Sequence, residues 1–283
     1  MELTDYHHLK QFKTYVKAKG YDTTVVGSIK TFFKKTKKGI KQITPQDIIN
    51  FLIYLTEKKM AGNTINGYLN SIRYFYKYAV LVGIVTEAFY STIIVPSTKK
   101  VRTEKRIMPV VTEKDFELII SKIPEVVSSM EPFIARAILY VLFYTGIRKG
   151  ELLNLCRKDI SLESCLLTVR LPNKVKRERI VYFPTFVADF IKSAYMVEDE
   201  EYNAFNLTPT RDILFAKELK DMTNKPITYH SFRHGFAHLM VKKGIDPGTL
   251  QRLMGHANVT TTLGYFNPTD EDIQEQYRKL TER

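Results

Sequence analysis

Two short stretches carry the signature from which the fold of this chain is predicted. Residues 145–153 read Thr-Gly-Ile-Arg-Lys-Gly-Glu-Leu-Leu, and residues 230–234 read His-Ser-Phe-Arg-His. In isolation, Arg148 and Glu151 have the i, i+3 spacing of an ordinary surface ion pair on a helix. His230, His234 and His238 follow at helical spacing, which also suits a metal-binding face, but no carboxylate or thiol stands at ligand spacing beside them. We therefore expect no metal there.

The sequence around these stretches predicts a mixed α/β domain over residues 109–283. Helical periodicity covers 112–123, 131–145, 147–156, 185–195, 230–243 and 247–255. Two strands, 165–171 and 180–183, flank a basic turn that holds Lys174. The polar, acidic stretch 197–212 predicts a loop. In the terminal segment 270–283, an apolar stripe of Ile273, Tyr277 and Leu280 predicts a short helix over about 270–280.

Residues 1–95 have a different texture and predict a small helical domain. Apolar residues recur at helical spacing over 4–19, 23–38, 45–59 and 63–81, and Thr44-Pro45 is a typical helix start. Residues 96–108, Pro-Ser-Thr-Lys-Lys-Val-Arg-Thr-Glu-Lys-Arg-Ile-Met, predict a basic linker. The expected fold class is mostly α with a small β-sheet, in two domains.

The charge of the chain is concentrated in its first third. The whole chain has 43 basic and 30 acidic residues and a net charge of +13. Residues 1–108 carry 19 basic and 7 acidic side chains, whereas 109–283 carry 24 and 23. A basic domain favours a polyanionic partner over a merely solvated surface, and we expect a nucleic acid. The candidate DNA contacts are basic side chains of the first domain and the linker: Lys30, Lys34, Lys35, Lys37, Lys38, Arg73, Lys77, Lys99, Lys100 and Arg102.

Composition excludes several other classes of protein. No apolar run is long enough to span a membrane, and the N-terminus is too polar for a signal peptide. The two cysteines, Cys156 and Cys165, cannot form a disulfide scaffold, and we interpret them as small buried residues in a reducing cytoplasm.

Six residues of the second domain together supply what a tyrosine needs to attack a phosphodiester: Arg148, Lys174, His230, Arg233, His256 and Tyr265. Guanidinium groups bind the non-bridging oxygens of phosphate, where charge grows in the transition state. A tyrosine with a pKa near ~10 needs a proton acceptor, and His230 is the candidate. Lys174 can protonate the leaving oxygen, and His256 can donate a hydrogen bond to the phosphate.

In their order and spacing, with Gly255-His256 nine residues ahead of Gly264-Tyr265, these motifs resemble the signature of the tyrosine recombinases, the phage-integrase family. The resemblance covers essentially the whole chain. It implies a SAM-like, core-binding DNA-binding domain over 1–95, a linker over 96–108 and a catalytic domain over 109–283. It further implies a site-specific recombinase that works without metal, ATP or another cofactor.

The same resemblance implies a mechanism and an assembly. Tyr265 would form a 3′-phosphotyrosine, and DNA strands would exchange through a Holliday junction. Glu151 would orient the residues of the active site without contacting the DNA itself. Four protomers would act on double-stranded DNA with paired inverted half-sites, and each C-terminal helix would dock on its neighbour. We expect no arm-binding domain ahead of the core-binding domain, as in the compact Xer-like and Cre-like types.

Several alternatives stay open. The family's usual turn is of the Gly-Lys-Gly type, whereas this chain has Pro172-Asn173-Lys174-Val175-Lys176-Arg177, so Lys176 is a second candidate for the general acid. Phe232 replaces the commoner leucine. A type IB topoisomerase and a DNA-binding protein without catalysis are rival functions, the latter disfavoured because all six reactive positions are filled. Integration, inversion and resolution, including that of transposon cointegrates, all use this chemistry.

Overall fold

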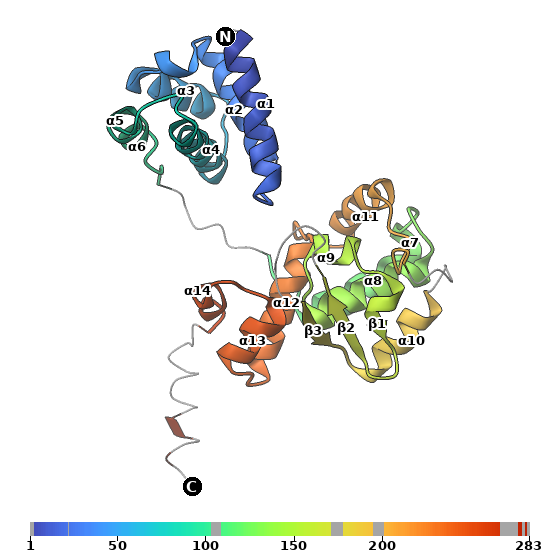
Figure 1. Ribbon diagram of the computed structural model, residues 1–283. Helices are drawn as coiled ribbons and strands as arrows, with labels where there is room; N and C mark the ends of the chain where they lie inside the picture. The colour runs from blue at the N-terminus through green and yellow to red at the C-terminus, as the bar shows by residue number, and fades with distance from the viewer. Residues whose placement is uncertain are drawn as a thin grey trace. The chain divides into compact units, whose positions relative to one another are not determined.

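The computed structural model describes residues 3–21, 23–102, 109–170, 178–194, 201–266, 277–278 and 281. The chain divides into two compact units, Met1–Arg106 and Ile107–Arg283, drawn from blue to red in Figure 1. The predicted fold class, mostly α with a small β-sheet, is confirmed. Lys174, Lys176 and most of the segment 270–283 lie outside the described residues.

The first unit contains the four helices that periodicity predicts. They are α1 (Leu3–Ala18), α2 (Thr24–Thr36), α3 (Pro45–Glu57) and α4 (Gly62–Leu81). The start of α3 is fixed locally, because the side chain of Thr44 accepts from the Asp47 amide while Asp47 Oδ2 accepts from the Thr44 amide at 2.8 Å. Pro45 occupies the first helical position, where its missing N–H costs nothing.

Aromatic side chains fill the core of the first unit. Phe12 of α1 meets Phe75 of α4 edge to face, with ring centroids 5.1 Å apart, and Phe33 of α2 meets the same ring at 5.5 Å. Such pairs stabilise beyond the area that they bury. These contacts hold α1 and α2 on α4.

The end of the first unit differs from the predicted linker. A helical segment continues through α5 (Glu87–Phe89), a π-helical turn η2 (Tyr90–Ile94) and α6 (Val95–Ser97). Thr98 is buried, and Arg73 donates to its hydroxyl at 3.2 Å and to its carbonyl at 2.8 Å. Asn66 also bonds both backbone groups of Val101. Residues 96–101, which we expected in the linker, therefore pack on the first unit.

The second unit is built around α8 (Pro132–Thr145), which is buried along most of its length. It contacts α7 (Glu113–Val126), α10 (Thr185–Ser193) and α12 (Tyr229–Lys242). An antiparallel sheet in the order β1-β2-β3 comprises Ile160–Ser161, Leu166–Val169 and Arg179–Tyr182. Leu167 pairs with Val181 and both side chains face the core, so the register places Arg179 opposite Val169.

Two helices of the second unit were not predicted. The first, α11 (Pro209–Asp221), begins inside the expected loop 197–212. Its apolar residues lie on more than one face, with Phe215 and Leu219 buried but Ile213 67% exposed, so it shows no clear periodicity. The signal that was present is Thr208-Pro209, the same start as Thr44-Pro45. The second, α14 (Val259–Leu263), is too short for periodicity to reveal.

Short elements complete the site-bearing end of this unit: α9 (Lys149–Leu153), the turn η3 (Arg157–Asp159) and α13 (Pro247–Met254). A further 3₁₀ turn, η1 (Ile40–Gln42), belongs to the first unit. Cys156 and Cys165 are unpaired with each other and half-buried rather than buried as we expected. Among the described helices, none combines the length and apolar character needed to cross a membrane.

Candidate active site

The turn after α8 brings Arg148 and Glu151 into the site. Gly146 ends α8 in the left-handed region with φ 61°, and a Cβ there would lie 2.3 Å from the ring of Phe236. Only glycine fits this position. Arg148 then stands at the start of α9, and its amide donates to Glu151 Oε2 at 2.8 Å while Nη1 donates to Oε1 at 2.9 Å. The pair noted in the sequence is therefore a structural element of the site rather than a surface ion pair.

Three consecutive carbonyls at the end of α13 each accept a hydrogen bond from an arginine. Arg179 Nε donates to Leu253 at 2.8 Å, Arg233 Nη2 donates to Met254, and Arg148 Nη2 donates to Gly255 at 2.8 Å. The last carbonyls of a helix have no partner within it and form the negative end of its dipole. The end of α13 thus gathers three guanidinium groups directly before His256.

Arg233 is the most enclosed of these arginines. It projects from α12, is 1% exposed and donates through Nη1 to the carbonyl of Gly146 at 2.6 Å. Burial and the nearby charge of Arg148 lower the pKa of Arg233 to about 9, which leaves it charged at neutral pH.

Glu151 is the buried anion of the cluster, with 2% of its surface exposed. Arg179 binds both of its oxygens, with Nη1 to Oε1 at 2.8 Å and Nη2 to Oε2 at 2.7 Å. Burial by itself raises the pKa of this carboxyl, but the hydrogen bonds and charges of Arg179 and Arg148 lower it to about 2. The carboxylate is therefore ionised throughout the working pH range.

The hydroxyl of Tyr265 lies 2.8 Å from Nδ1 of His234. We expected His230 as its proton acceptor, but His230 lies one helical turn earlier, with its ring centroid 4.7 Å from that of His234. Burial and the neighbouring His230 lower the pKa of His234 to about 4, so His234 is neutral at pH 7 and able to accept a proton. Burial also raises the pKa of Tyr265, against the opposing charge of Arg233.

His256 lies between the arginines and the tyrosine. Its Nδ1 is 2.9 Å from Thr262 Oγ1, and its ring is nearly parallel to that of Tyr265 at 6.4 Å between centroids. The contact with Thr262 fixes the ring orientation and leaves Nε2 for a ligand. Burial and then the charge of Arg233 lower the pKa of His256 to about 4.

The structure brings five of the six predicted site residues into one region: Arg148, His230, Arg233, His256 and Tyr265. A hollow of about 530 Å³ opens there, with Arg148, His230 and Arg233 in its lining and Lys217 and Lys220 of α11 at its side. The sixth, Lys174, lies outside the described residues. The residues that sequence reasoning missed are His234 and Arg179. In the sequence, the spacing of His234 suggests only a metal-binding face, and Arg179 is one of several basic residues around a turn.

Most predicted DNA-contact residues of the first unit are exposed, but three have partners within that unit. Lys38 forms an ion pair with Asp47 at 2.8 Å, and Lys35 lies over the ring of Tyr54 at 4.2 Å. Arg73 is half-buried, and its Nε and Nη2 donate to Thr98, so a DNA contact through this side chain stays a prediction. The exposed ones are Lys30, Lys34, Lys35, Lys37, Lys77, Lys99, Lys100 and Arg102.

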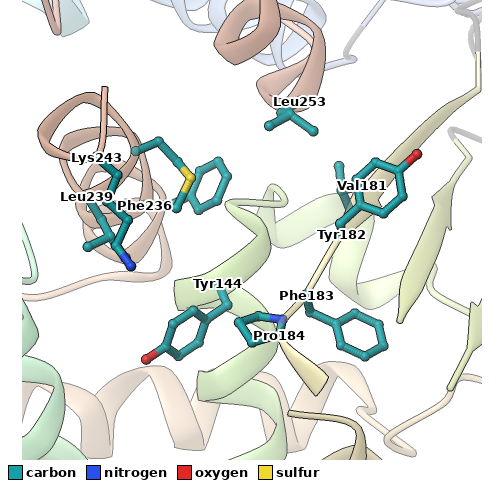
Figure 2. Close-up of a pocket in the computed structure, with 10 residues that line it drawn as sticks. Tyr144, Val181, Tyr182, Phe183, Pro184, Phe236, Leu239, Lys243 and Leu253 are labelled. Carbon is teal, nitrogen blue, oxygen red and sulfur yellow. The ribbon is translucent and has the colours of Figure 1, made fainter. Parts of the chain in front are cut away.

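An apolar groove of about 250 Å³ lies on the second unit (Figure 2). Tyr182 and Pro184 line one side, Phe236 and Leu239 of α12 line another, and Leu253 of α13 contributes from the end of its helix. Lys243 adds one charge at its border. Within the described part of the chain, no three His, Cys, Asp or Glu side chains are grouped to hold a metal ion.

A helical unit and an α/β unit with arginines gathered near a half-buried tyrosine define the class of tyrosine recombinases. The family model described as "Phage integrase family" matches residues 109–272, and the model of the N-terminal SAM-like domain of phage integrases matches residues 8–82. The first match covers more than half of the chain. The chain therefore belongs to the phage integrase family, that of the tyrosine-type site-specific recombinases.

Similar proteins match over nearly the full length of the chain. The chain is 27% identical to the tyrosine recombinase XerA of Pyrococcus furiosus over 277 residues, 94% of this chain and 91% of that protein. It is 28% identical over 297 residues to the tyrosine recombinase XerC of Leptospira interrogans, 95% and 91% of the two. The solved structure of the Tn1549 transposon integrase with circular intermediate DNA has a TM-score of 0.69 at 17% identity, covering 97% and 99%. This last likeness shows the fold.

Proposed function

We propose that this protein cleaves and rejoins DNA at specific sites by a transesterification in which Tyr265 is the nucleophile. The observation that carries the proposal is the 2.8 Å contact between the Tyr265 hydroxyl and Nδ1 of His234, a histidine whose lowered pKa favours the neutral form, in the region where the arginines gather. A phenol needs both a proton acceptor and nearby positive charge to attack a phosphodiester near neutral pH.

In the proposed step, the Tyr265 oxygen forms a bond to the scissile phosphorus while the bond to the 5′-oxygen breaks. The products are a 3′-phosphotyrosine and a free 5′-hydroxyl. Attack by that hydroxyl, or by one from a second duplex, reverses the step. Because one phosphodiester replaces another, the energy of the broken bond is kept in the phosphotyrosine. The proposed reaction therefore uses no ATP and no cofactor.

Arg148, Arg233 and His256 bind the phosphate in this scheme. Arg148 is 37% exposed on its side chain, and its guanidinium still has donors beyond those used on Glu151 and Gly255. Arg233 is held between two carbonyls and supplies a preorganised charge, and Nε2 of His256 supplies a hydrogen bond. Preorganised donors act without reorganising at the moment of reaction.

Two histidines and a lysine move the protons. His234 takes the phenol proton in the observed geometry, and His230, at the hollow beside Arg148 and Arg233, remains the acid/base partner on the phosphate side. Burial and these two arginines lower the pKa of His230 as well, which favours its neutral form. Lys174 gives a proton to the leaving 5′-oxygen, with Lys176 as the alternative donor.

We further propose that recombination uses a tetramer on double-stranded DNA with paired inverted half-sites, through a Holliday junction, in the cytoplasm. The two units would divide this work: the basic unit, expected over 1–95 and extended by the packing of residues 96–101, would bind the core site, residues 102–108 would connect the units, and 109–283 would catalyse. The exposed lysines of the first unit support its DNA-binding role, because phosphate neutralisation dominates affinity.

The apolar groove of Figure 2 is the proposed acceptor for the C-terminal helix of a second copy. The groove is lined mainly by apolar side chains, and so it suits the apolar stripe of Ile273, Tyr277 and Leu280. Tyr277 is the one stripe residue that the structure describes, and it is 67% exposed in the single chain.

A plasmid experiment tests the proposed function. A duplex site is first selected from a random-sequence library by binding to the full chain, and supercoiled plasmids then carry one or two copies. We expect deletion or inversion products only with two copies, and none with Tyr265→Phe. Relaxation without regard to the number of sites would instead indicate a topoisomerase, and binding without any covalent complex would contradict catalysis.

A further inference from the structure

Arg179 is the arginine of the cluster that sequence reasoning did not single out. It begins β3, directly after the basic turn, and its side chain is 15% exposed. Each of its three guanidinium nitrogens donates within the protein, Nε to Leu253 and Nη1 and Nη2 to Glu151. A guanidinium engaged in this way is not directed at a phosphate, so its role must be sought in what it holds.

We propose that Arg179 is a positioning residue that sets the guanidinium of Arg148 for the scissile phosphate, acting through the carboxylate of Glu151 and the backbone of Gly255. The inference rests on the function proposed above, because it assigns a task to Arg148 in that reaction.

The first link is the competition for Glu151. Arginine and carboxylate favour a bidentate pair. Arg179 forms that pair, with contacts of 2.8 and 2.7 Å, and Arg148 is left with one guanidinium contact to Oε1 at 2.9 Å. Without Arg179, the buried carboxylate of Glu151 would have only Arg148 as a cationic partner. Arg148 would then form the bidentate pair itself, and its guanidinium would turn away from the DNA. Arg179 therefore keeps Arg148 partly free and 37% exposed.

The second link runs through Gly255. This residue has φ 60°, and a Cβ on it would lie 3.1 Å from three side-chain atoms of Arg179. The arginine therefore lies against the backbone whose carbonyl accepts from Arg148 Nη2 at 2.8 Å. Because His256 follows directly, the same contact supports a second proposed phosphate-binding residue.

The test uses Arg179→Lys, which keeps the charge and loses the fork. The control is Arg170→Lys, at the end of the neighbouring strand, because Arg170 also forms ion pairs, with Asp159 and Glu178, but is 44% exposed and outside the cluster. The probe is the duplex selected by the wild-type chain. We measure binding by gel shift, covalent complex under single-turnover conditions, and the melting temperature.

We expect Arg179→Lys to bind the duplex normally and to form the covalent complex about 10- to 100-fold more slowly, the scale for misplacing a reacting group. Arg170→Lys should match the wild type. The melting temperature reports a merely structural role, and the same change is repeated in a Glu151→Gln background. There the additional loss of rate should be smaller than in the wild-type background, because residues that act as one unit are not additive, and the loss that remains reports the contact with Gly255.

Two results would overturn the inference: a wild-type rate for Arg179→Lys, or equal losses with and without Glu151. If Arg179→Lys does not fold, the double variant Arg179→Gln with Glu151→Gln removes the buried charge together with its partner. It should fold and react slowly, and a wild-type rate in it would refute the positioning role. A wild-type chain that forms no covalent complex would instead refute the proposed function itself.

Discussion

The hydroxyl of Tyr265 and Nδ1 of His234 lie 2.8 Å apart, within hydrogen-bond distance. His238 also contacts this tyrosine, edge-on with centroids 5.6 Å apart, but through the ring rather than the hydroxyl. The two histidines project from the same helix and therefore form a matched pair for testing proton transfer.

Replacing His234 by phenylalanine should keep the ring and remove the proton acceptor. We expect His234→Phe to bind the selected duplex normally and to form the covalent complex at least about 10²-fold more slowly, the lower range for general-base catalysis. His238→Phe should react at nearly the wild-type rate. Equal losses in the two variants would show that packing around Tyr265, rather than proton transfer, explains the effect.

Replacing Arg148 by lysine should separate charge from geometry. Arg148→Lys keeps the cation but cannot contact Glu151, Gly255 and a phosphate oxygen together. Duplex binding should remain near normal, and cleavage should fall by about 10²-fold or more, as for loss of one preorganised donor. The check is the covalent complex measured beside a gel shift, and undiminished cleavage would contradict the role of Arg148.

The general acid is tested through the leaving group. A substrate with sulfur at the bridging 5′ position has a leaving group that needs no proton. The matched variants are Lys174→Ala and Lys176→Ala, whose positions lie outside the described residues. The sulfur substrate should rescue cleavage by Lys174→Ala and make no difference to Lys176→Ala. Rescue of Lys176→Ala alone would assign the proton to Lys176.

The sequence predicts the parts of this protein that depend on periodicity and local capping. In the first unit α1 to α4 have regularly spaced apolar residues, α8 is apolar along most of its length, and Thr44 caps α3 through local contacts. The sequence does not predict α11, because the apolar residues of this helix lie on several faces and give no helical periodicity. The resemblance of the motifs predicts Arg148 and Arg233 as site residues. That the hydroxyl of Tyr265 lies beside His234 and not His230 depends on where α12 and α14 place Tyr265, which is a tertiary relationship.

The same distinction explains why Arg179 was missed. Residues 172–179 are rich in basic side chains, and the sequence does not reveal which of them turns inward. The strand register shows that Arg179 turns inward. Pairing of Leu167 with Val181 sets the orientation of β3 and brings Arg179 to the end of α13.

Removing residues 270–283 tests the proposed acceptor groove. The truncated chain should bind one half-site as the full chain does, lose cooperative binding of a second copy and lose recombination between two sites. Burial of three large apolar side chains contributes on the order of several kcal/mol, so the change should be evident in a gel-shift titration.

A groove variant, Tyr182→Asp, supplies the matched comparison, because Tyr182 lines the groove and is 60% exposed, so the change need not disturb the core. In a mixture, the truncated chain should still accept the tail of an intact chain, whereas Tyr182→Asp should not. Unchanged cooperativity after truncation would exclude docking in trans.

The identity of the nucleophile is tested most directly by mapping the covalent bond. The full chain is incubated with the selected duplex, denatured in detergent and digested, and the peptide that carries a nucleotide is identified by mass spectrometry. The account predicts a 3′-linked nucleotide on the oxygen of Tyr265 and no adduct with Tyr265→Phe, although that variant binds the duplex normally. A nucleotide on any other residue, or a detergent-resistant complex formed by Tyr265→Phe, would contradict it.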